Sequence, residues 1–237
     1  MSGTVIGEDA RARLVRRFGD GVTGWVDALP GLVARLAERW DLTVTAHLPG
    51  GTSATFLCAT AVLKLTPDHD LAAAEARALT AWDATPAAVG LLDTDLARGA
   101  LLLERLDPGT PAPDPARVLP RLHIAPPQGF PPLSARVDFL FETLLPRRTG
   151  TYHAAEHRRA RELAADRVTP VLLHGDLHPG NVLRGPRGPV AIDPRPCVGD
   201  PAFDWTDLVH DGYDLHGADV DLDRVHEWLA VFAPFYG

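Results

Sequence analysis

A short run of residues, 174–181, carries the side chains that are best suited to chemistry. It reads HGDLHPGN and follows the apolar segment VLL, and a second apolar segment, VAI, ends at Asp193. Asp176, Asn181 and Asp193 therefore stand near the ends of short strand-like segments. Carboxylate and amide oxygens are hard ligands that suit magnesium, which takes its remaining ligands from water and substrate phosphates. The pattern predicts an ion cage at the edge of a small hairpin.

The spacing within this run also points to phosphoryl transfer. Asp176 and Asn181 are five residues apart, as are the aspartate and asparagine of the kinase catalytic loop. In that loop the aspartate orients the attacking hydroxyl group and the asparagine holds metal. One kinase-like arrangement would thus account for Asp176, Asn181 and Asp193 together.

Two other interpretations of the same run stay open. His174, Asp176 and His178 could bind a transition metal, but the glycine within the run and the proline after it disfavour a shared face for the three side chains. Alternatively, Asp176 and Asn181 only satisfy backbone groups of a loop, as Asp and Asn often do. That second interpretation leaves Asp193 without a role.

Lys64 is a second candidate, because the chain has 22 arginines and this one lysine. It lies in the strand-like segment AVLKL, and a compact ammonium group suits nucleotide phosphates in a tight site. Glu75 follows eleven residues later in an expected helix and can reach back to Lys64. In kinases such an ion pair holds the lysine on the phosphates. A lysine exposed at a sheet edge is the simpler alternative.

The elements that must position these residues change in character along the chain. Leu29 to Trp40 shows helical periodicity, residues 42–48, 54–58 and 61–65 read as strands, and Asp68 or Asp70 can cap a helix with Leu71, Ala74, Ala78, Leu79 and Trp82 in its buried stripe. A turn at residues 93–99 and a strand at 100–106 follow. We expect an antiparallel sheet with one prominent helix.

A proline-rich segment, residues 107–115, reads as a linker, because its four prolines cannot continue a helix or a central strand. Helical patterns dominate beyond it: residues 133–144 carry an apolar face and residues 152–167 form a polar helix. The sequence therefore predicts an α+β protein with an N-terminal nucleotide-binding lobe at 1–106 and a catalytic and substrate lobe at 107–237.

The bulk composition fits a folded chain with a sizeable core. The 237 residues are 46% hydrophobic, and no apolar run approaches the roughly 18 residues of a membrane-spanning helix. The first residues lack the basic start and apolar middle of a signal peptide, so we expect a cytoplasmic protein without a membrane partner. Cys58 and Cys197 lie in no paired motif, which predicts two reduced thiols.

The net charge of −8 is concentrated at one end. Residues 199–237 contain nine acidic residues against Arg224 alone, and the charges of residues 1–198 cancel. There is no basic stripe to neutralise phosphates, so we expect no nucleic-acid partner. The acidic end is typical of a solvated helical surface, with a cation-binding surface as the alternative.

Taken together, these segments resemble the aminoglycoside phosphotransferases, most closely their streptomycin 6-kinase and hydroxyurea kinase branch. The resemblance covers about residues 40–230 and implies a protein-kinase-like fold of two lobes with ATP between them. The residues that carry it are HGDLHPGN with Asn181, AIDP with Asp193, VGDPAFDW with Asp204, and the pair Lys64 and Glu75.

The resemblance implies a role for each of these residues in the C-terminal half. Asp176 would be the catalytic base, and Asn181 and Asp193 would be the Mg²⁺ ligands. Asp204 would support the catalytic loop without reacting itself.

In the N-terminal half, the resemblance makes Lys64 the phosphate anchor and Glu75 its partner. The segment LLLERL would be the hinge, whose backbone from Glu104 to Leu106 meets the adenine of ATP. The segment HLPGGTSAT lacks the full glycine pattern of a kinase phosphate loop.

The expected acceptor is streptomycin, a small molecule with cationic guanidinium groups that carboxylates such as Asp207, Asp211 or Asp214 would attract. Neutral hydroxyurea, choline or ethanolamine, and a sugar are alternatives within the enzymes, and a pseudokinase that acts through protein contacts is the alternative outside them. The short stretch after Asp193 disfavours a eukaryotic-type protein kinase. Related chains continue beyond FAPFYG, so we expect a shortened C-terminal lobe; the sequence predicts no oligomeric state.

Overall fold

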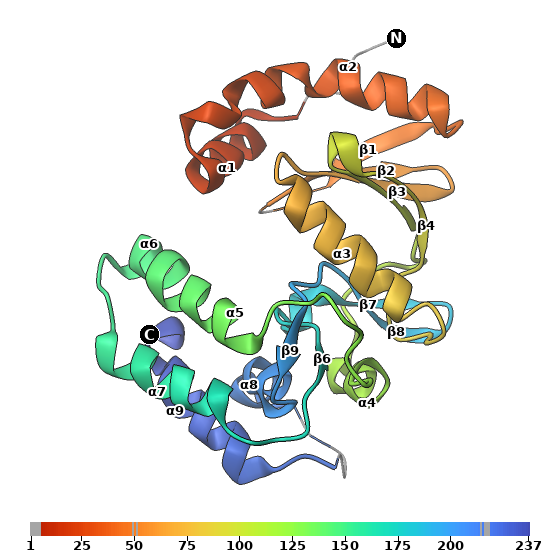
Figure 1. Ribbon diagram of the computed structural model, residues 1–237. Coiled ribbons are helices and arrows are strands. Elements are labelled where there is room, and N and C mark those ends of the chain that lie inside the picture. The colour runs from red at the N-terminus through yellow and green to blue at the C-terminus, as the bar shows by residue number, and fades with distance from the viewer. Residues whose placement is uncertain (1–5, 49, 51, 214, 216–218) are drawn as a thin grey trace. The chain divides into compact units, whose positions relative to one another are not determined.

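The computed structural model describes residues 6–48, 50, 52–213, 215 and 219–237 (Figure 1). Its contacts divide the chain into two compact units. The first, here called the N-terminal unit, comprises Met1–Thr80 and Val89–Leu106. The second, the C-terminal unit, comprises Ala81–Ala88 and Asp107–Gly237.

Within the described residues, the N-terminal unit contains a five-stranded antiparallel sheet in the order β1-β2-β3-β5-β4. The three segments predicted as strands at 54–58, 61–65 and 100–106 are confirmed, although the last strand ends at Glu104. The strands are β1 (Val44–Leu48), β2 (Ala54–Cys58), β3 (Ala61–Leu65), β4 (Leu91–Asp95) and β5 (Ala100–Glu104).

Two predictions about this sheet were wrong in detail. A register shift between Val44 and Ala46 breaks the expected alternation in β1, and Ala46 is exposed instead of sharing a buried face. A bulge of this kind adds one residue to a strand and displaces the side chains after it. The predicted turn at 93–99 is shorter, because β4 continues through Asp95 and a 3-10 helix, Leu96–Arg98, makes the turn.

The sheet lies between helices, with α1 (Glu8–Phe18) and α2 (Thr23–Arg39) on one face (Figure 1). Leu63 and Leu65 of β3 point into this helical layer, together with Phe56 of β2. Because side chains alternate along a strand, Lys64 points to the opposite face. The alternation of AVLKL therefore fixes which side of the sheet receives the amine.

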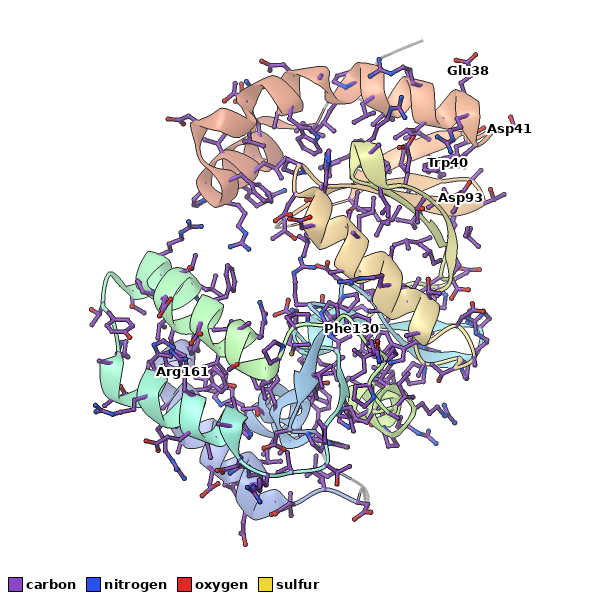
Figure 2. The ribbon with its side chains drawn as sticks, viewed as in Figure 1. Glu38, Trp40, Asp41, Asp93, Phe130 and Arg161 are labelled. Carbon is purple, nitrogen blue, oxygen red and sulfur yellow. The ribbon has the colours of Figure 1, made fainter. Side chains whose placement is uncertain are left out.

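The end of α2 is tied to the edge of the sheet. Trp40, the residue after the helix, donates from its indole Nε1 to Oδ2 of Asp93 at 2.7 Å (Figure 2). Arg39 donates to Asp95, also at 2.7 Å. The helix predicted from periodicity thus exists, begins earlier than expected and is anchored to β4.

The helix α3 (His69–Ala81) covers the face of the sheet that carries Lys64. Asp68 is its cap, since the backbone N–H of Leu71 donates to Oδ1 of Asp68 at 3.0 Å. The buried stripe differs from the predicted one in part: Leu71 and Ala74 are only half-buried. The fully buried residues of α3 are Ala72, Glu75, Ala76, Ala78 and Leu79.

The C-terminal unit contains two short antiparallel ladders in its described residues. The strand β6 (Val171–Leu173) pairs with β9 (Cys197–Gly199), and β7 (Val182–Gly185) pairs with β8 (Gly188–Ala191). This confirms the strands predicted on either side of the HGDLHPGN run. Cys58 and Cys197 are both free thiols, as expected.

Helices form the rest of the C-terminal unit. The segment predicted from residues 133–144 is one helical run in three pieces, and its middle piece is a π-helix that the sequence did not predict. Figure 1 shows α5 beside α7, and α7 also packs against α9. The described helical pieces are η3 (Pro115–Val118), α4 (Leu119–Leu122), α5 (Leu133–Phe139), η4 (Leu140–Leu144), α6 (Leu145–Thr149), α7 (Ala154–Ala165), η5 (Pro179–Asn181), α8 (Ala202–His210) and α9 (Leu222–Tyr236).

The proline-rich segment is more than a linker. The backbone of Gly109 donates to Arg184 at 3.0 Å, and Arg184 donates to Thr110 at 2.7 Å, so this stretch lies along the outer edge of β7. Prolines are tolerated there because an edge strand leaves some N–H groups unused. Throughout the described ranges, no helix combines the length and apolarity that crossing a membrane requires.

Candidate active site

The Lys64 amine and the Glu75 carboxylate form a buried ion pair within the N-terminal unit. The Nζ atom of Lys64 lies 2.7 Å from Oε1 and 2.6 Å from Oε2 of Glu75. Only 9% of the lysine side chain and 2% of the glutamate side chain are exposed. A lone buried charge would be strongly unfavourable, so each residue makes the burial of the other tolerable. The alternative of an exposed lysine at a sheet edge is therefore wrong, since β3 is a central strand.

Glu104 and Leu106 lie where β5 ends. The backbone N–H of Glu104 donates to the carbonyl of Gly90 at 2.8 Å, and both residues are half-buried. The next side chain, Arg105, donates to the carbonyls of Cys58 and Ala59, at 3.0 Å each. These bonds fix the backbone that the resemblance assigns to adenine contact.

In the C-terminal unit, the structure brings Asp176 and Asn181 together. The side-chain Nδ2 of Asn181 donates to the backbone carbonyl of Asp176 at 2.9 Å, and Asn181 is buried. The carboxylate of Asp176 points elsewhere: its side chain is 34% exposed, and its Oδ1 accepts from Nη2 of Arg136 at 2.8 Å. The loop thus presents a carboxylate that an incoming molecule can reach.

Gly175 allows the sharp turn before Asp176. Its φ is +76°, and a Cβ there would collide with the carbonyl oxygen of Arg195. Only glycine combines that conformation with that approach at little steric cost. The glycine of HGD is therefore required by the backbone itself.

Asp204 stabilises this turn through hydrogen bonds to its backbone. Its carboxylate accepts from the backbone N–H groups of His174 and Gly175, at 2.8 Å each, and lies 3.2 Å from Nε2 of His123. Burial alone would raise the pKa of Asp204, but the hydrogen bond and charge of His123 and the Gly175 N–H outweigh it and hold the pKa below its usual range. The supporting role expected for Asp204 is confirmed by these contacts.

His174 links the loop of residues 174–181 to the segment that carries Asp193. Its Nε2 lies 3.0 Å from the carbonyl of Ile192, and its own carbonyl accepts from the N–H of Arg195 at 2.8 Å. Complete burial lowers the pKa of His174, which favours the neutral ring. The chain on both sides of Asp193 is consequently fixed relative to Asp176.

Asp193 lies just after β8 with a φ of +58°, a conformation that Asp tolerates better than most residues. Its Oδ1 accepts from Nη1 of Arg195 at 2.9 Å, and the neighbouring Ile192 N–H donates to the carbonyl of Asn181 at 2.9 Å. Non-glycine residues in this region cluster at functional sites. Asn181 and Asp193 are thereby held on adjoining backbone.

The donor set fits a magnesium ion. The amide nitrogen of Asn181 is committed to the Asp176 carbonyl, so the amide oxygen is the atom left for a cation. Asp193 adds a carboxylate, and both are the hard oxygen ligands that magnesium prefers. Oδ1 of Asp193 is paired with Nη1 of Arg195 in this structure, so a magnesium ion would share the carboxylate with that guanidinium group.

The alternative interpretation of a metal site formed by His174, Asp176 and His178 is not supported. His174 uses Nε2 on Ile192, whereas Nδ1 of His178 accepts from the N–H of Gly180 at 3.1 Å. Within the described residues, the group of ligand atoms close enough to hold a metal is Asp138, Glu142 and His157, not the histidines of the loop. His157 there is paired with both Tyr152 and Asp138 and joins α5 to α7.

A cavity of about 450 Å³ opens beside Asp176, entirely within the C-terminal unit. Its wall carries four aspartates, Asp176, Asp204, Asp207 and Asp211, and aromatic rings from α8 and α9. The carboxylate of Asp204 is already bound to backbone N–H groups of the loop, which leaves the other three for a ligand. Asp214, the third carboxylate expected to attract a cation, lies outside the described residues. The residues that line the cavity are Arg136, Leu140, Leu144, Arg148, Gly175, Asp176, Leu177, His178, Phe203, Asp204, Thr206, Asp207, His210, Asp211, Phe232, Phe235 and Tyr236.

Asp207 is an acid on this wall whose pKa is raised. Burial raises its pKa, while a hydrogen bond from Tyr236 Oη, 2.6 Å from Oδ1, opposes the rise. The ring of Tyr236 stacks on His210 with centroids 3.7 Å apart. A half-buried carboxylate on a cavity wall is suited to pair with a cationic group of a ligand.

Sequence reasoning missed Arg136 and Tyr236. Arg136 falls within the apolar stripe, three residues after Leu133 and four before Leu140, and a charge in that stripe was the available signal. Tyr236 gave no comparable signal, because it meets Asp207 only through the packing of α8 against α9.

Comparisons with known proteins agree with this geometry. A hydroxyurea phosphotransferase of Kitasatospora aureofaciens is 35% identical, over 84% of this chain and 69% of that protein. A streptomycin 6-kinase of Streptomyces glaucescens is 32% identical, over 93% of this chain and 79% of that protein. Among solved structures, macrolide 2'-phosphotransferase type I aligns with a TM-score of 0.56 and 19% identity, covering 87% of this chain and 89% of that one.

The structural likeness establishes an α+β, protein-kinase-like fold, as the sequence predicted. The family model for aminoglycoside/hydroxyurea antibiotic resistance kinases matches residues 39–234, a range that includes all the candidate site residues except Phe235 and Tyr236 of the cavity wall. The chain therefore belongs to this family of kinase-type phosphotransferases.

Proposed function

We propose that the protein transfers the γ-phosphate of ATP to a hydroxyl group of a small cationic acceptor, with streptomycin as the leading candidate. The observation that carries the proposal is the cavity beside Asp176. Its volume of about 450 Å³ falls in the range of sites for drug-sized ligands. Its carboxylates offer partners for guanidinium groups, and its aromatic rings offer apolar contact.

In this proposal Asp176 is the catalytic base. The oxygen of the acceptor hydroxyl group would bond to the γ-phosphorus as the bond from phosphorus to the ADP oxygen breaks. An exposed carboxylate oxygen of Asp176 at the cavity wall would accept the proton of that hydroxyl group. Phosphoryl transfer asks little covalent chemistry of the protein, so orientation and charge neutralisation account for most of the acceleration. Asp204 and Asn181 support the role by fixing the backbone around Asp176.

Lys64, held by Glu75, would bind the phosphates of the nucleotide, and the backbone from Glu104 to Leu106 would bind adenine. Asn181 and Asp193 would hold Mg²⁺, which when bound neutralises charge on the phosphates. The lysine is fixed by a bidentate ion pair, so little reorganisation is needed when a nucleotide arrives.

Hydroxyurea is the second candidate acceptor, because a hydroxyurea phosphotransferase is among the similar proteins. It is neutral and much smaller than the ligands that fill cavities of this size, so the acidic wall would contribute little to its binding. The carboxylates of Asp207 and Asp211 therefore favour streptomycin.

The test is a panel of acceptors. Purified protein is incubated with Mg-ATP and, separately, with streptomycin, other aminoglycosides, hydroxyurea and choline, and products are identified by mass. We expect streptomycin to gain one phosphoryl group. Asp176→Asn should reduce product formation by about 10³-fold or more, whereas Asp83→Asn, a change at an exposed aspartate, should not. Phosphorylation of hydroxyurea alone would overturn the choice of acceptor, and phosphorylation of none would overturn the proposed function.

A further inference from the structure

Arg136 makes an unusual pair of contacts with the loop that carries Asp176. From α5, its Nε donates to the carbonyl of Gly175 at 2.8 Å and its Nη2 donates to Oδ1 of Asp176 at 2.8 Å. One planar guanidinium group thus donates hydrogen bonds to two consecutive residues. A guanidinium fork has this fixed geometry, whereas a lysine ammonium group does not.

The position is costly for a cation. Only 11% of the Arg136 side chain is exposed, and burial lowers its pKa while the nearby Asp176 opposes that effect. An ion pair formed only to join a helix to a loop could lie at the surface at far lower desolvation cost. A buried arginine on a reachable carboxylate is therefore better explained by the direction it gives to that carboxylate.

The contact makes the two carboxylate oxygens of Asp176 inequivalent. Oδ1 is bound to Arg136, which leaves Oδ2 to face an incoming hydroxyl group. Rotation about the last side-chain bond would exchange the two oxygens, and the bond to Arg136 opposes that rotation. Since Gly175 is bound by the same guanidinium group, the backbone and the carboxylate are fixed as one piece.

The helix that carries Arg136 is shaped for this purpose. Arg136, Leu140, Leu144 and Arg148 all line the cavity, at steps of four residues. In an α-helix such residues drift around the axis, because 3.6 residues make a turn. The wider turn of the π-helix at Leu140–Leu144 opposes the drift and keeps the four side chains on one face. π-Helical turns are frequent at functional sites.

We propose that Arg136 is a positioning residue, which sets the orientation of the Asp176 carboxylate so that Oδ2 meets the acceptor hydroxyl group. The proposal rests on the proposed function of Asp176 as the base. It differs from a structural role for Arg136 in one respect: the loss of Arg136 should reduce turnover at saturating substrates in protein that is still folded.

The experiment compares Arg136→Met and Arg136→Lys with Arg158→Met, a matched change at an exposed arginine of α7. The measured quantities are kcat, the KM for the acceptor, Mg-ATP affinity and the melting temperature. In Arg136→Met we expect kcat to fall about 10²-fold, as for a small misplacement of a reacting group, with Mg-ATP affinity within about twofold. Arg136→Lys should lie between, because it can satisfy only one of the two oxygens well.

Chemical rescue separates orientation from folding. In Arg136→Ala, millimolar guanidinium chloride should restore part of kcat, and an equal concentration of sodium chloride should not. In an Asp176→Asn background, Arg136→Met should reduce kcat little further, because the carboxylate that it orients is gone.

The outcomes also separate this proposal from the proposed function. A wild-type protein that phosphorylates no acceptor overturns both. An active wild-type protein overturns only the role of Arg136 if kcat is unchanged in Arg136→Met. The same holds if kcat falls only in proportion to the folded fraction. Where Arg136→Met does not fold, Arg136→Lys with unchanged kcat, or absence of guanidinium rescue, overturns it.

Discussion

The Lys64–Glu75 pair and the surroundings of Asp176 differ in how far solvent can reach them. The pair is closed: its side chains are 9% and 2% exposed, and each satisfies the other. Asp176 is open, with 34% of its side chain exposed on a cavity wall built from five helical segments and the loop itself. A closed pair suits a partner that never varies, such as a nucleotide phosphate, whereas an open wall suits acceptors of different shapes.

The same contrast appears in how each region is held. Lys64 and Glu75 are eleven residues apart and come from consecutive elements, β3 and α3. Asp176 depends on Arg136 and Asp204, which are 40 and 28 residues away in the chain. The first region is local and the second is assembled by tertiary packing, so substitutions should affect the first through stability and the second through turnover or acceptor binding.

The largest expected effect is on turnover. Asp176→Asn keeps the size of the side chain but removes the carboxylate that accepts the hydroxyl proton, so kcat should fall by about 10³-fold or more. Mg-ATP affinity should stay close to wild type, whereas the melting temperature should fall modestly, because the Arg136 guanidinium group loses its charged partner. Steady-state kinetics and nucleotide titration check both. Full turnover in this variant would contradict the assignment of the base.

The closed pair should respond in the opposite way. Lys64→Met leaves Glu75 as a buried charge without its cation, which should reduce the free energy of unfolding by about 3–5 kcal/mol. Lys64→Met combined with Glu75→Leu should recover much of that loss, because an apolar pair can replace a buried ion pair. Mg-ATP affinity should be lower than in wild type in both variants, because both lack the Lys64 amine.

Urea unfolding and nucleotide titration of the single and double variants test this separation. If the double variant binds Mg-ATP as tightly as wild type, Lys64 is a structural residue and not a phosphate anchor. Glu75→Gln serves as a milder control, since its amide can still accept one hydrogen bond from Lys64.

The contrast between local and assembled regions also explains how much the sequence could predict. The strands around Lys64, the cap at Asp68 and the hairpin after Asn181 follow from patterns of a few residues, and the structure confirms them. The role of Asp204 was also anticipated from a motif. The contact between Glu75 and Lys64 was expected as well, and the structure shows it. The bulge in β1 was not predicted, because it depends on how β1 pairs with β2.

The cavity was beyond prediction for the same reason. Arg136 and Tyr236 reach their partners across 40 and 29 residues of chain, and the distance between them is set by packing of α5, α8 and α9. The proline-rich segment was misread because its hydrogen bonds go to β7, which begins 67 residues after Pro115. Periodicity describes one element at a time and carries no information about such partners.

An intermediate effect is expected at Asp204. In Asp204→Asn the amide nitrogen would face backbone N–H groups of the loop, so the free energy of unfolding should fall by about 2–3 kcal/mol. The folded-state pKa of Asp204 lies below its ordinary 3.8, so its ionised form adds stability that is complete above that pH and is lost as the pH falls through the folded value. Urea unfolding should therefore show the gap between wild type and variant closing on acidification. A gap independent of pH would contradict the role of the charge.

The smallest effect, and the one that most sharpens the contrast, is expected at Asp207. Asp207→Asn should raise the KM for streptomycin about tenfold, corresponding to about 1.4 kcal/mol of lost binding, with kcat and the KM for ATP little changed. A neutral acceptor should not respond, and Asp83→Asn should leave both unchanged. Equal effects on cationic and neutral acceptors would show that Asp207 shapes the cavity without pairing with charge.

The pH dependence of the same KM gives an independent check. Burial raises the pKa of Asp207, so its carboxylate becomes charged only as the pH rises through that raised value, and the KM for a cationic acceptor should fall over the same range. Tyr236→Phe removes the hydrogen bond that favours the charged form, so the fall should move to higher pH. In Asp207→Asn the pH dependence should disappear. Because Tyr236 belongs to α9 and Asp207 to α8, a shift in Tyr236→Phe would show that the open region is tuned by tertiary packing and not by the local sequence around Asp207.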